Sequence, residues 1–182
     1  MNVTSELDAR FRAAALAQGL VDVRYDLVDS PFGELFVAET ERGLCRISYF
    51  PEPAEEEVGR IFGRRLLRMP VDNTRRELNE YFEGRRREFD LALDLRVAAF
   101  NADVLRELAL VPYGLTTTYG ALAAKAGHPK AARAVGTVMN RNPIPIVLPC
   151  HRVVGANGAL TGYAGGLDIK RRLLELEGAA LS

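Results

Sequence analysis

Short apolar runs separated by turn residues occupy the first half of the chain. They lie at 23–28, 35–38 and 44–50, with Ser-Pro-Phe-Gly and Glu-Arg-Gly segments between them. The third run alternates apolar and polar side chains, which is typical of a strand with one buried face. The pattern predicts an antiparallel meander, and an alternating apolar and acidic run at 89–95 is expected to add its last strand.

Helical spacing of apolar residues surrounds these runs. The segments 5–19, 55–67 and 73–82 carry apolar side chains three or four positions apart, which predicts three helices. Together with the meander, they indicate an N-terminal α/β domain over residues 1–95 with a small antiparallel sheet. Cys45, inside the third apolar run, is expected to be a small buried apolar residue.

The second half, residues 96–182, is dominated by helical spacing. Helices are expected at 101–110, 119–126, 129–140 and 168–177. Only Gly-His-Pro separates the second helix from the third, which is typical of a helix-turn-helix. The fold class is therefore α+β, with a mostly helical C-terminal domain. The residues expected to begin these helices are Asn101, Thr117 or Thr118, and Pro129.

Charge is unevenly divided between the two halves, although the whole chain is neutral. Residues 1–95 carry 14 basic and 19 acidic side chains, whereas residues 96–182 carry 10 basic and 5 acidic ones. No acidic residue occurs from Ala109 to Leu167. This window tolerates a polyanion such as nucleic acid at close range. Because the charge is modest, chance clustering on a solvated face remains the simpler explanation.

Composition excludes several classes of protein. The 48% apolar and 26% charged content is that of an ordinary globular protein, and no apolar run approaches the roughly 20 residues that span a bilayer. The N-terminus is too polar for a secretory signal, and two cysteines make no disulfide framework, so we expect a cytoplasmic protein. With only His128 and His151 as histidines, no metal site is expected. No cofactor is expected either.

The main candidate for chemistry follows an apolar run at 144–148, which is expected to be a buried strand ended by Pro149. Cys150 and His151 come next. A thiol near pKa 8.5 needs a base to become a thiolate, but neighbouring side chains point in different directions. A relay through water is therefore expected, with Glu177 as a candidate to orient the imidazole. An incidental Cys-His pair remains an alternative.

The predicted helix at 129–140 is unusually slim. Small side chains at positions 131, 132, 134 and 136 allow another surface to approach its backbone, and Arg133 is the long charged side chain among them. Tight packing against a second helix explains the same small residues.

The segment Ile-Pro-Ile-Val-Leu-Pro-Cys-His-Arg-Val-Val at 144–154 resembles the active-site motif of the O6-alkylguanine-DNA alkyltransferases, which repair DNA by direct reversal. The resemblance covers residues 97–178, while the N-terminal half is similar only in outline. Leu105 stands where the family often has tryptophan, which affects helix packing and not the chemistry. Other matching segments are Val-Pro-Tyr-Gly (111–114), Thr-Tyr-Gly-Ala-Leu-Ala (118–123), Lys-Ala-Ala-Arg-Ala-Val-Gly (130–136) and Leu-Thr-Gly-Tyr-Ala-Gly-Gly-Leu (160–167).

The resemblance implies an irreversible, single-turnover transfer of a methyl or larger alkyl group from O6 of guanine in duplex DNA to Cys150. It further implies minor-groove binding by the helix-turn-helix and flipping of the damaged base. The implied partner is double-stranded DNA with an alkylated guanine, the protein being a monomer that binds no membrane, with clustering on DNA left open. A non-catalytic binder of alkylated DNA and an unrelated Cys-His hydrolase or acyltransferase remain the competing functions.

The resemblance also assigns roles to single residues. His151 and Glu177 match the water-mediated relay to Cys150, and Asn142 matches the hinge before the active-site segment. Arg133 matches the finger that replaces the flipped base, and Tyr119 matches the residue that presses on the target phosphate. The implied DNA and base contacts are Tyr119, Ala131, Ala132, Arg133, Ala134, Gly136, Met139, Arg152, Val153, Tyr163 and Ala164.

Overall fold

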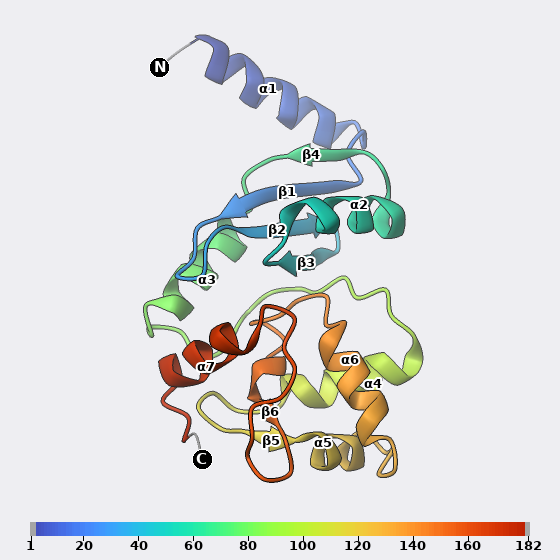
Figure 1. Ribbon diagram of the computed structural model, residues 1–182. Helices are drawn as coiled ribbons and strands as arrows, with labels where there is room; N and C mark the ends of the chain where they lie inside the picture. Colours follow the sequence, from blue (N-terminus) through green and yellow to red (C-terminus); the bar gives the residue numbers. More distant parts are fainter. Residues whose placement is uncertain (1–2, 181–182) are drawn as a thin grey trace. The chain divides into compact units, whose positions relative to one another are not determined.

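The computed structural model describes residues 3–180, and the chain forms two compact units (Figure 1). The first unit runs to Arg76 and adds Leu91–Asp94, while the second takes Glu77–Asp90 and the rest of the chain. Helix α3 (Asp72–Phe82) therefore begins in one unit and ends in the other. The segment after the middle of α3 thus packs with residues that follow it much later in sequence.

A four-stranded sheet in the order β3-β2-β1-β4 forms the framework of the first unit. Strands β1 (Val23–Val28), β2 (Leu35–Thr40) and β3 (Gly43–Ser48) are antiparallel neighbours, and β4 (Leu66–Arg68) pairs in parallel with β1. The predicted meander and the α+β class are confirmed.

The fourth strand is not the one that the sequence pattern predicts. Residues 89–95 do not form a strand, and their pairing with β3 is limited to an isolated bridge between Leu93 and Leu44. Helix α2 (Pro51–Phe62) ends earlier than predicted, because Gly63 adopts a φ of 130° that an L side chain rarely takes. The residues freed by this early end form β4 beside β1.

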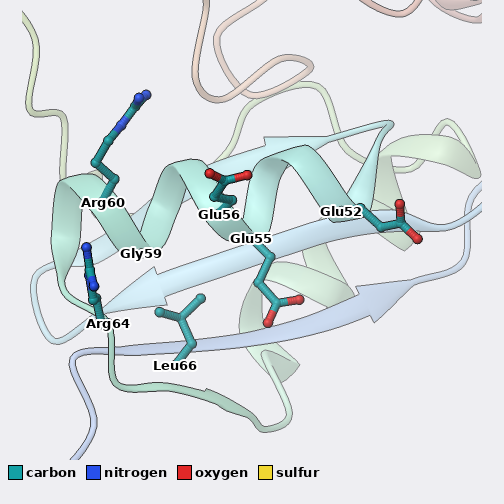
Figure 2. Close-up of a pocket in the computed structure, with 7 residues that line it drawn as sticks. All are labelled: Glu52, Glu55, Glu56, Gly59, Arg60, Arg64 and Leu66. Atoms are coloured by element: carbon teal, nitrogen blue, oxygen red, sulfur yellow. The ribbon is translucent and has the colours of Figure 1, made fainter.

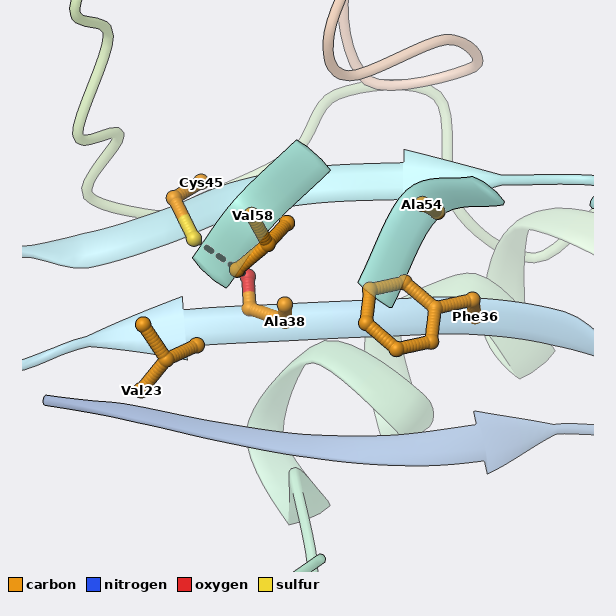
Figure 3. Packing of buried hydrophobic residues seen from close by; sticks show 6 residues of the cluster. All are labelled: Val23, Phe36, Ala38, Cys45, Ala54 and Val58. Carbon is orange, nitrogen blue, oxygen red and sulfur yellow. Dashed lines mark hydrogen bonds between the residues drawn. The ribbon is translucent and has the colours of Figure 1, made fainter. Parts of the chain in front are cut away.

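Helix α2 packs on the sheet and closes a small hydrophobic core (Figure 3). Cys45 is 1% exposed, and its Sγ lies 3.3 Å from the carbonyl oxygen of Ala38. The prediction that Cys45 is a small buried residue is confirmed. The cluster consists of Val23, Phe36, Ala38, Cys45, Ala54 and Val58.

A charged hollow of about 700 Å³ lies beside α2 and β4 (Figure 2). Its acidic side chains come from the first two turns of α2 and its basic ones from the end of α2 and the following loop, an order that suits the helix dipole. The lining holds no nucleophile. It consists of Glu52, Glu55, Glu56, Gly59, Arg60, Arg64 and Leu66.

Helix α1 (Val3–Ala17) precedes the sheet and is less embedded than its pattern predicts. Ala15 is buried, but Leu7 and Phe11 are 66% and 65% exposed. These two large apolar side chains therefore remain largely in solvent. Among the helices within residues 3–180, none combines the length and apolar character needed to cross a membrane.

The second unit is mostly helical, as predicted. Its core combines apolar side chains from its helices, among them the buried Leu105, with those of the loop at 144–148. A pair of two-residue parallel strands, β5 and β6, joins the start of the helix-turn-helix to the segment after Cys150. The elements are α4 (Ala99–Ala109), β5 (Thr117–Thr118), α5 (Tyr119–Lys125), α6 (Ala132–Asn140), β6 (Val153–Val154) and α7 (Leu167–Leu176).

Helices α5 and α6 form the predicted helix-turn-helix. Thr118 caps α5, because its Oγ1 accepts a hydrogen bond from the backbone N–H of Ala121 (3.2 Å). Two other predicted helix starts are wrong. Pro129 lies in a turn before α6, closed by the N–H of Ala131 and the carbonyl of His128 (2.9 Å), and Asn101 lies inside α4.

Candidate active site

Cys150 begins a short 3₁₀ helix, η1 (Cys150–Arg152), at the end of an apolar loop. The run at 144–148 is largely buried, as predicted, but it is not a strand. The three prolines within residues 143–149 lack the N–H groups that a ladder requires, and Ile146 takes a φ of 76°. The chain therefore turns back on itself just before the cysteine.

Asn142 closes this loop. Its Nδ2 donates to the carbonyl oxygen of Leu148 (2.7 Å), and its Oδ1 accepts from the N–H of Ile144 (3.1 Å). The N–H of Cys150 donates to the same Leu148 carbonyl (2.8 Å). One buried amide thus fixes the backbone immediately before the thiol.

The thiol of Cys150 is 3% exposed. Burial raises the pKa of Cys150 to about 11, although a hydrogen bond with Asn142 and the positive charge of Lys170 partly oppose this rise. The thiol is therefore protonated at neutral pH. It must lose its proton to a base before it can attack an electrophile.

The carboxylate of Glu177 is buried at the C-terminal end of α7 and receives five donors. Burial opposes its ionisation, but hydrogen bonds led by those of His151 and Arg152 outweigh burial and lower the pKa of Glu177 to about 2. Oε1 accepts from Tyr81 Oη (2.7 Å), His151 Nε2 (2.8 Å) and Arg152 Nη2 (2.9 Å), and Oε2 accepts from Arg152 Nε (2.9 Å) and Gly114 N (3.2 Å).

The ionised Glu177 determines the tautomer of His151. A carboxylate can only accept, so the hydrogen lies on His151 Nε2. Burial lowers the pKa of His151, despite the opposing effect of Glu177, and keeps the ring neutral. The lone pair is then on Nδ1, which has no hydrogen-bond partner among the described residues. The imidazole is neutral and ready to accept a proton, and it does not contact the Cys150 thiol directly.

Arg152 is placed differently from the expectation of a DNA contact. Its side chain is 6% exposed, and its guanidinium forms a bidentate pair with Glu177. A further hydrogen bond runs from Nη1 to the carbonyl oxygen of Val111. The guanidinium therefore faces the interior of the second unit and stabilises the charge of Glu177.

Lys170 is a buried residue of the site to which the sequence pattern assigned no role. Its Nζ donates to the carbonyl oxygens of Val153 (2.6 Å) and Thr161 (2.7 Å). Burial lowers the pKa of Lys170 to about 8, opposed by the Cys150 thiolate. The ammonium thus ties the segment at Thr161 to β6 and places a positive charge near the thiol.

A hollow of about 420 Å³ opens between α6 and the segments at 155 and 161–162. The hydroxyl of Tyr119 accepts a hydrogen bond from Thr161 Oγ1 (3.1 Å) at its edge. Arg133 is exposed, and Gly136 leaves room for the Tyr119 ring, 3.9 Å from where a Cβ would lie. The lining consists of Tyr119, Ala132, Arg133, Gly136, Asn140, Gly155, Thr161 and Gly162.

The structure brings together two groups of the expected site residues. Asn142, Cys150, His151, Arg152 and Glu177 form the buried network, and Tyr119, Ala132, Arg133 and Gly136 line the hollow. The remaining candidates lie outside that lining: Ala131 is half-buried, Ala134 and Ala164 are exposed, and Met139, Val153 and Tyr163 are buried.

Comparison with protein families gives two matches. The DNA-binding domain of 6-O-methylguanine DNA methyltransferase matches residues 99–179, and the ribonuclease-like domain of the same protein matches residues 23–95. The matched ranges begin after α1. Together they cover both the sheet of the first unit and the buried network around Cys150.

Individual relatives are similar over most of the chain. A methylated-DNA–protein-cysteine methyltransferase of Methanosarcina acetivorans is 42% identical, covering 85% of this chain and 98% of the relative. A constitutive protein of that name from Bacillus subtilis is 39% identical, covering 84% and 94%. The crystal structure of Mycobacterium tuberculosis OGT in complex with DNA matches with a TM-score of 0.77 and 41% identity, over 85% of this chain and 92% of that one.

Proposed function

The chain belongs to the 6-O-methylguanine DNA methyltransferase family, and we propose that it repairs alkylated guanine in duplex DNA by one irreversible transfer to Cys150. It is a methylated-DNA–protein-cysteine methyltransferase that binds DNA. The observation that carries the detailed proposal is a buried thiol beside a neutral imidazole, whose free nitrogen is defined by an ionised carboxylate.

The transfer is a nucleophilic displacement at the alkyl carbon. The proton of the Cys150 thiol passes to His151 Nδ1 through a bridging water, since the two groups are not hydrogen-bonded to each other. The thiolate forms an S–C bond as the bond between that carbon and guanine O6 breaks. The guanine leaves as an anion that takes up one proton, for which the Tyr119 hydroxyl is the candidate donor.

The product explains why one turnover is proposed. A thioether is not hydrolysed under cellular conditions. The described residues of the Cys150 site offer an acid–base relay but no group that would displace the alkyl from sulfur. A Cys-His hydrolase, in contrast, forms an acyl–enzyme intermediate that water can hydrolyse. Each chain therefore repairs one base.

The proposed DNA contact uses α6, the second helix of the helix-turn-helix. Its small residues Ala131, Ala132, Ala134 and Gly136 permit a close approach to a minor groove. Arg133 is exposed at the hollow, where it could occupy the place of a flipped base. Flipping is required because a thiol that is 3% exposed cannot reach a base inside the stack. Met139, Val153, Tyr163 and Ala164 are the proposed further contacts of that base.

Transfer of labelled methyl groups tests the proposal. The protein is incubated with duplex DNA that contains O6-methylguanine with a radioactive methyl group, and digestion followed by mass spectrometry locates the label. We expect one label per chain, on Cys150, and no further reaction when fresh DNA is added. Repeated turnover would indicate a hydrolase, and tight binding without transfer would indicate a non-catalytic binder.

Replacing Arg133 with alanine should slow repair in duplex DNA at least about tenfold, because extruding a base costs a few kcal/mol and the finger offsets part of this cost. Reaction with free O6-methylguanine should be unchanged, since no base is extruded. Lys125→Ala is the matched control, because Lys125 is an exposed cation of α5 in the same acid-free window. Equal losses of Arg133→Ala on both substrates would exclude a role in flipping.

A further inference from the structure

Tyr81 lies near the end of α3, in the segment Glu77–Asp90 that packs within the second unit. Its side chain is completely buried. The hydroxyl donates to Glu177 Oε1 at 2.7 Å, which is one of the shortest contacts of that carboxylate. A residue from the first half of the chain therefore touches the group that orients His151.

The surroundings of Tyr81 leave its hydroxyl one function. Burial, together with the charge of Glu177, raises the pKa of Tyr81 far above its usual range, so the phenol stays protonated and acts as a donor. Its ring packs against Phe82, Phe89 and Tyr113, with centroids 5.4 to 6.1 Å apart. These rings hold the hydroxyl in place beside Oε1.

Tyr81 and His151 share a single oxygen atom of Glu177. Arg152 Nη2 is the third donor to this oxygen, and these contacts together fix the plane of the carboxylate. This plane decides where the His151 ring points. Without the Tyr81 hydroxyl, Oε1 keeps its contacts with His151 and Arg152 but loses one of its three donors. It would also attract the N–H of His151 more strongly.

We propose that Tyr81 is a positioning residue of the transfer reaction, which acts through Glu177 to hold the free nitrogen of His151 toward the Cys150 thiol. The inference rests on the proposed function for its consequences in repair. The predicted acid–base behaviour of Cys150 is independent of the proposed function, because any small alkylating agent can report it. The segment that carries Tyr81 thereby becomes part of the alkyl-acceptor unit.

Tyr81→Phe tests this inference, because it removes the hydroxyl and keeps the ring that packs in the cluster. We expect methyl transfer from duplex DNA to slow about tenfold at pH 7.5, with unchanged affinity for DNA. The second readout is alkylation of Cys150 by iodomethane as a function of pH, quantified by mass spectrometry. The acid limb of this pH profile should move to higher pH. The carboxylate of Glu177, having lost one donor, raises the pKa of His151.

The charges that face His151 are those of Glu177, Arg152 and Lys170, with the Cys150 thiol as the fourth titratable group. Tyr81→Phe leaves all of them in place, so a shift of the acid limb reports the carboxylate alone. Direct titration of the His151 ring by NMR provides an independent measurement of the same shift.

Tyr113→Phe is the matched control. Tyr113 belongs to the same aromatic cluster, but its hydroxyl donates to the carbonyl oxygen of Leu176 (3.1 Å) and not to Glu177. We expect a wild-type rate and an unshifted pH profile. The inference is overturned if the pH profile of Tyr81→Phe matches that of the wild type, or if Tyr113→Phe shifts the profile equally.

The two proposals fail in different ways. If the wild type took no methyl group from DNA while Tyr81→Phe alone shifted the iodomethane profile, the repair function would fall and the positioning role would stand. If DNA repair proceeded and the profile did not move, the positioning role would fall and the repair function would stand.

Discussion

Glu177→Gln is expected to slow methyl transfer by roughly 10²–10⁴-fold, the range that a general base contributes. In the wild type, the ionised carboxylate of Glu177 accepts a hydrogen bond from the Nε2–H of His151. It thereby stabilises the imidazolium that forms when the thiol loses its proton. The glutamine amide is neutral, and its NH₂ group faces hydrogen-bond donors that contact a carboxylate oxygen in the wild type. The pKa of His151, already lowered by burial, falls further, and the ring becomes a weaker base.

The pH dependence of this defect separates a chemical role from a purely structural one. The pKa of the Cys150 thiol is about 11, so the thiolate forms without help from His151 as the pH rises toward that value. The deficit of Glu177→Gln should therefore be largest near pH 7 and shrink toward pH 10. Single-turnover rates with excess DNA measure it, and Glu175→Gln, an exposed neighbour on α7, serves as the control. A deficit that is constant over this range would mean that Glu177 acts only through folding.

The helix-turn-helix, the antiparallel meander and the burial of Cys45 follow from local patterns, and these predictions are confirmed. The apolar run before Cys150 shows where local pattern fails. Its length and composition predict a strand, but the prolines leave too few N–H groups for pairing, and Ile146 turns the chain through a positive φ. Burial of the run was predictable, whereas its path depends on Asn142 and the loop that this amide closes.

The two buried cations of the site, Lys170 and Arg152, show how far local pattern could have predicted them. Lys170 and Glu177 are separated by seven residues, with Leu173 and Leu174 between them at helical spacing, so that all four share the buried face of α7. That spacing could have singled out Lys170 from the following arginines. Arg152 gives no such signal, because a residue in a three-residue 3₁₀ helix has no face that a pattern defines.

Tyr81 was beyond the reach of sequence pattern for another reason. It is 96 residues from Glu177, and nothing in the local spacing of α3 shows that its last turns pack with the C-terminal half of the chain. The contact exists because Glu77–Asp90 leaves the first unit. Long-range partners of this kind become visible only when the chain is folded.

Arg152→Met is expected to lower the free energy of unfolding by about 3–5 kcal/mol, the cost of removing one partner from a buried ion pair. Arg152 supplies two of the five hydrogen bonds to Glu177, and both side chains are almost completely buried. Methionine fills much of the volume but leaves the carboxylate without its cation. Denaturant unfolding at pH 7 measures the change, and Arg171→Met, on the exposed side of α7, should cost less than about 0.5 kcal/mol.

The same variant makes a prediction about acid. The pKa of Glu177 is about 2 in the folded chain and near 4.5 when unfolded, so its ionisation contributes stability above pH 4.5 that is lost as the pH falls toward 2. Arg152→Met raises the folded pKa and forfeits this contribution at neutral pH. The stability gap between wild type and variant should therefore narrow between pH 5 and pH 3. A gap of the same size at both values would show that Arg152 stabilises the fold through packing and not through the charge of Glu177.

The salt dependence of DNA binding distinguishes this role of Arg152 from the DNA contact that the family resemblance implied. Each phosphate neutralised by a cation adds about 0.9 to the slope of log affinity against log salt. An arginine whose guanidinium is committed to Glu177 adds nothing, so Arg152→Met should keep the wild-type slope at temperatures where it is folded. A slope reduced by about one would place the guanidinium on DNA and would contradict the buried pair as its state in the complex.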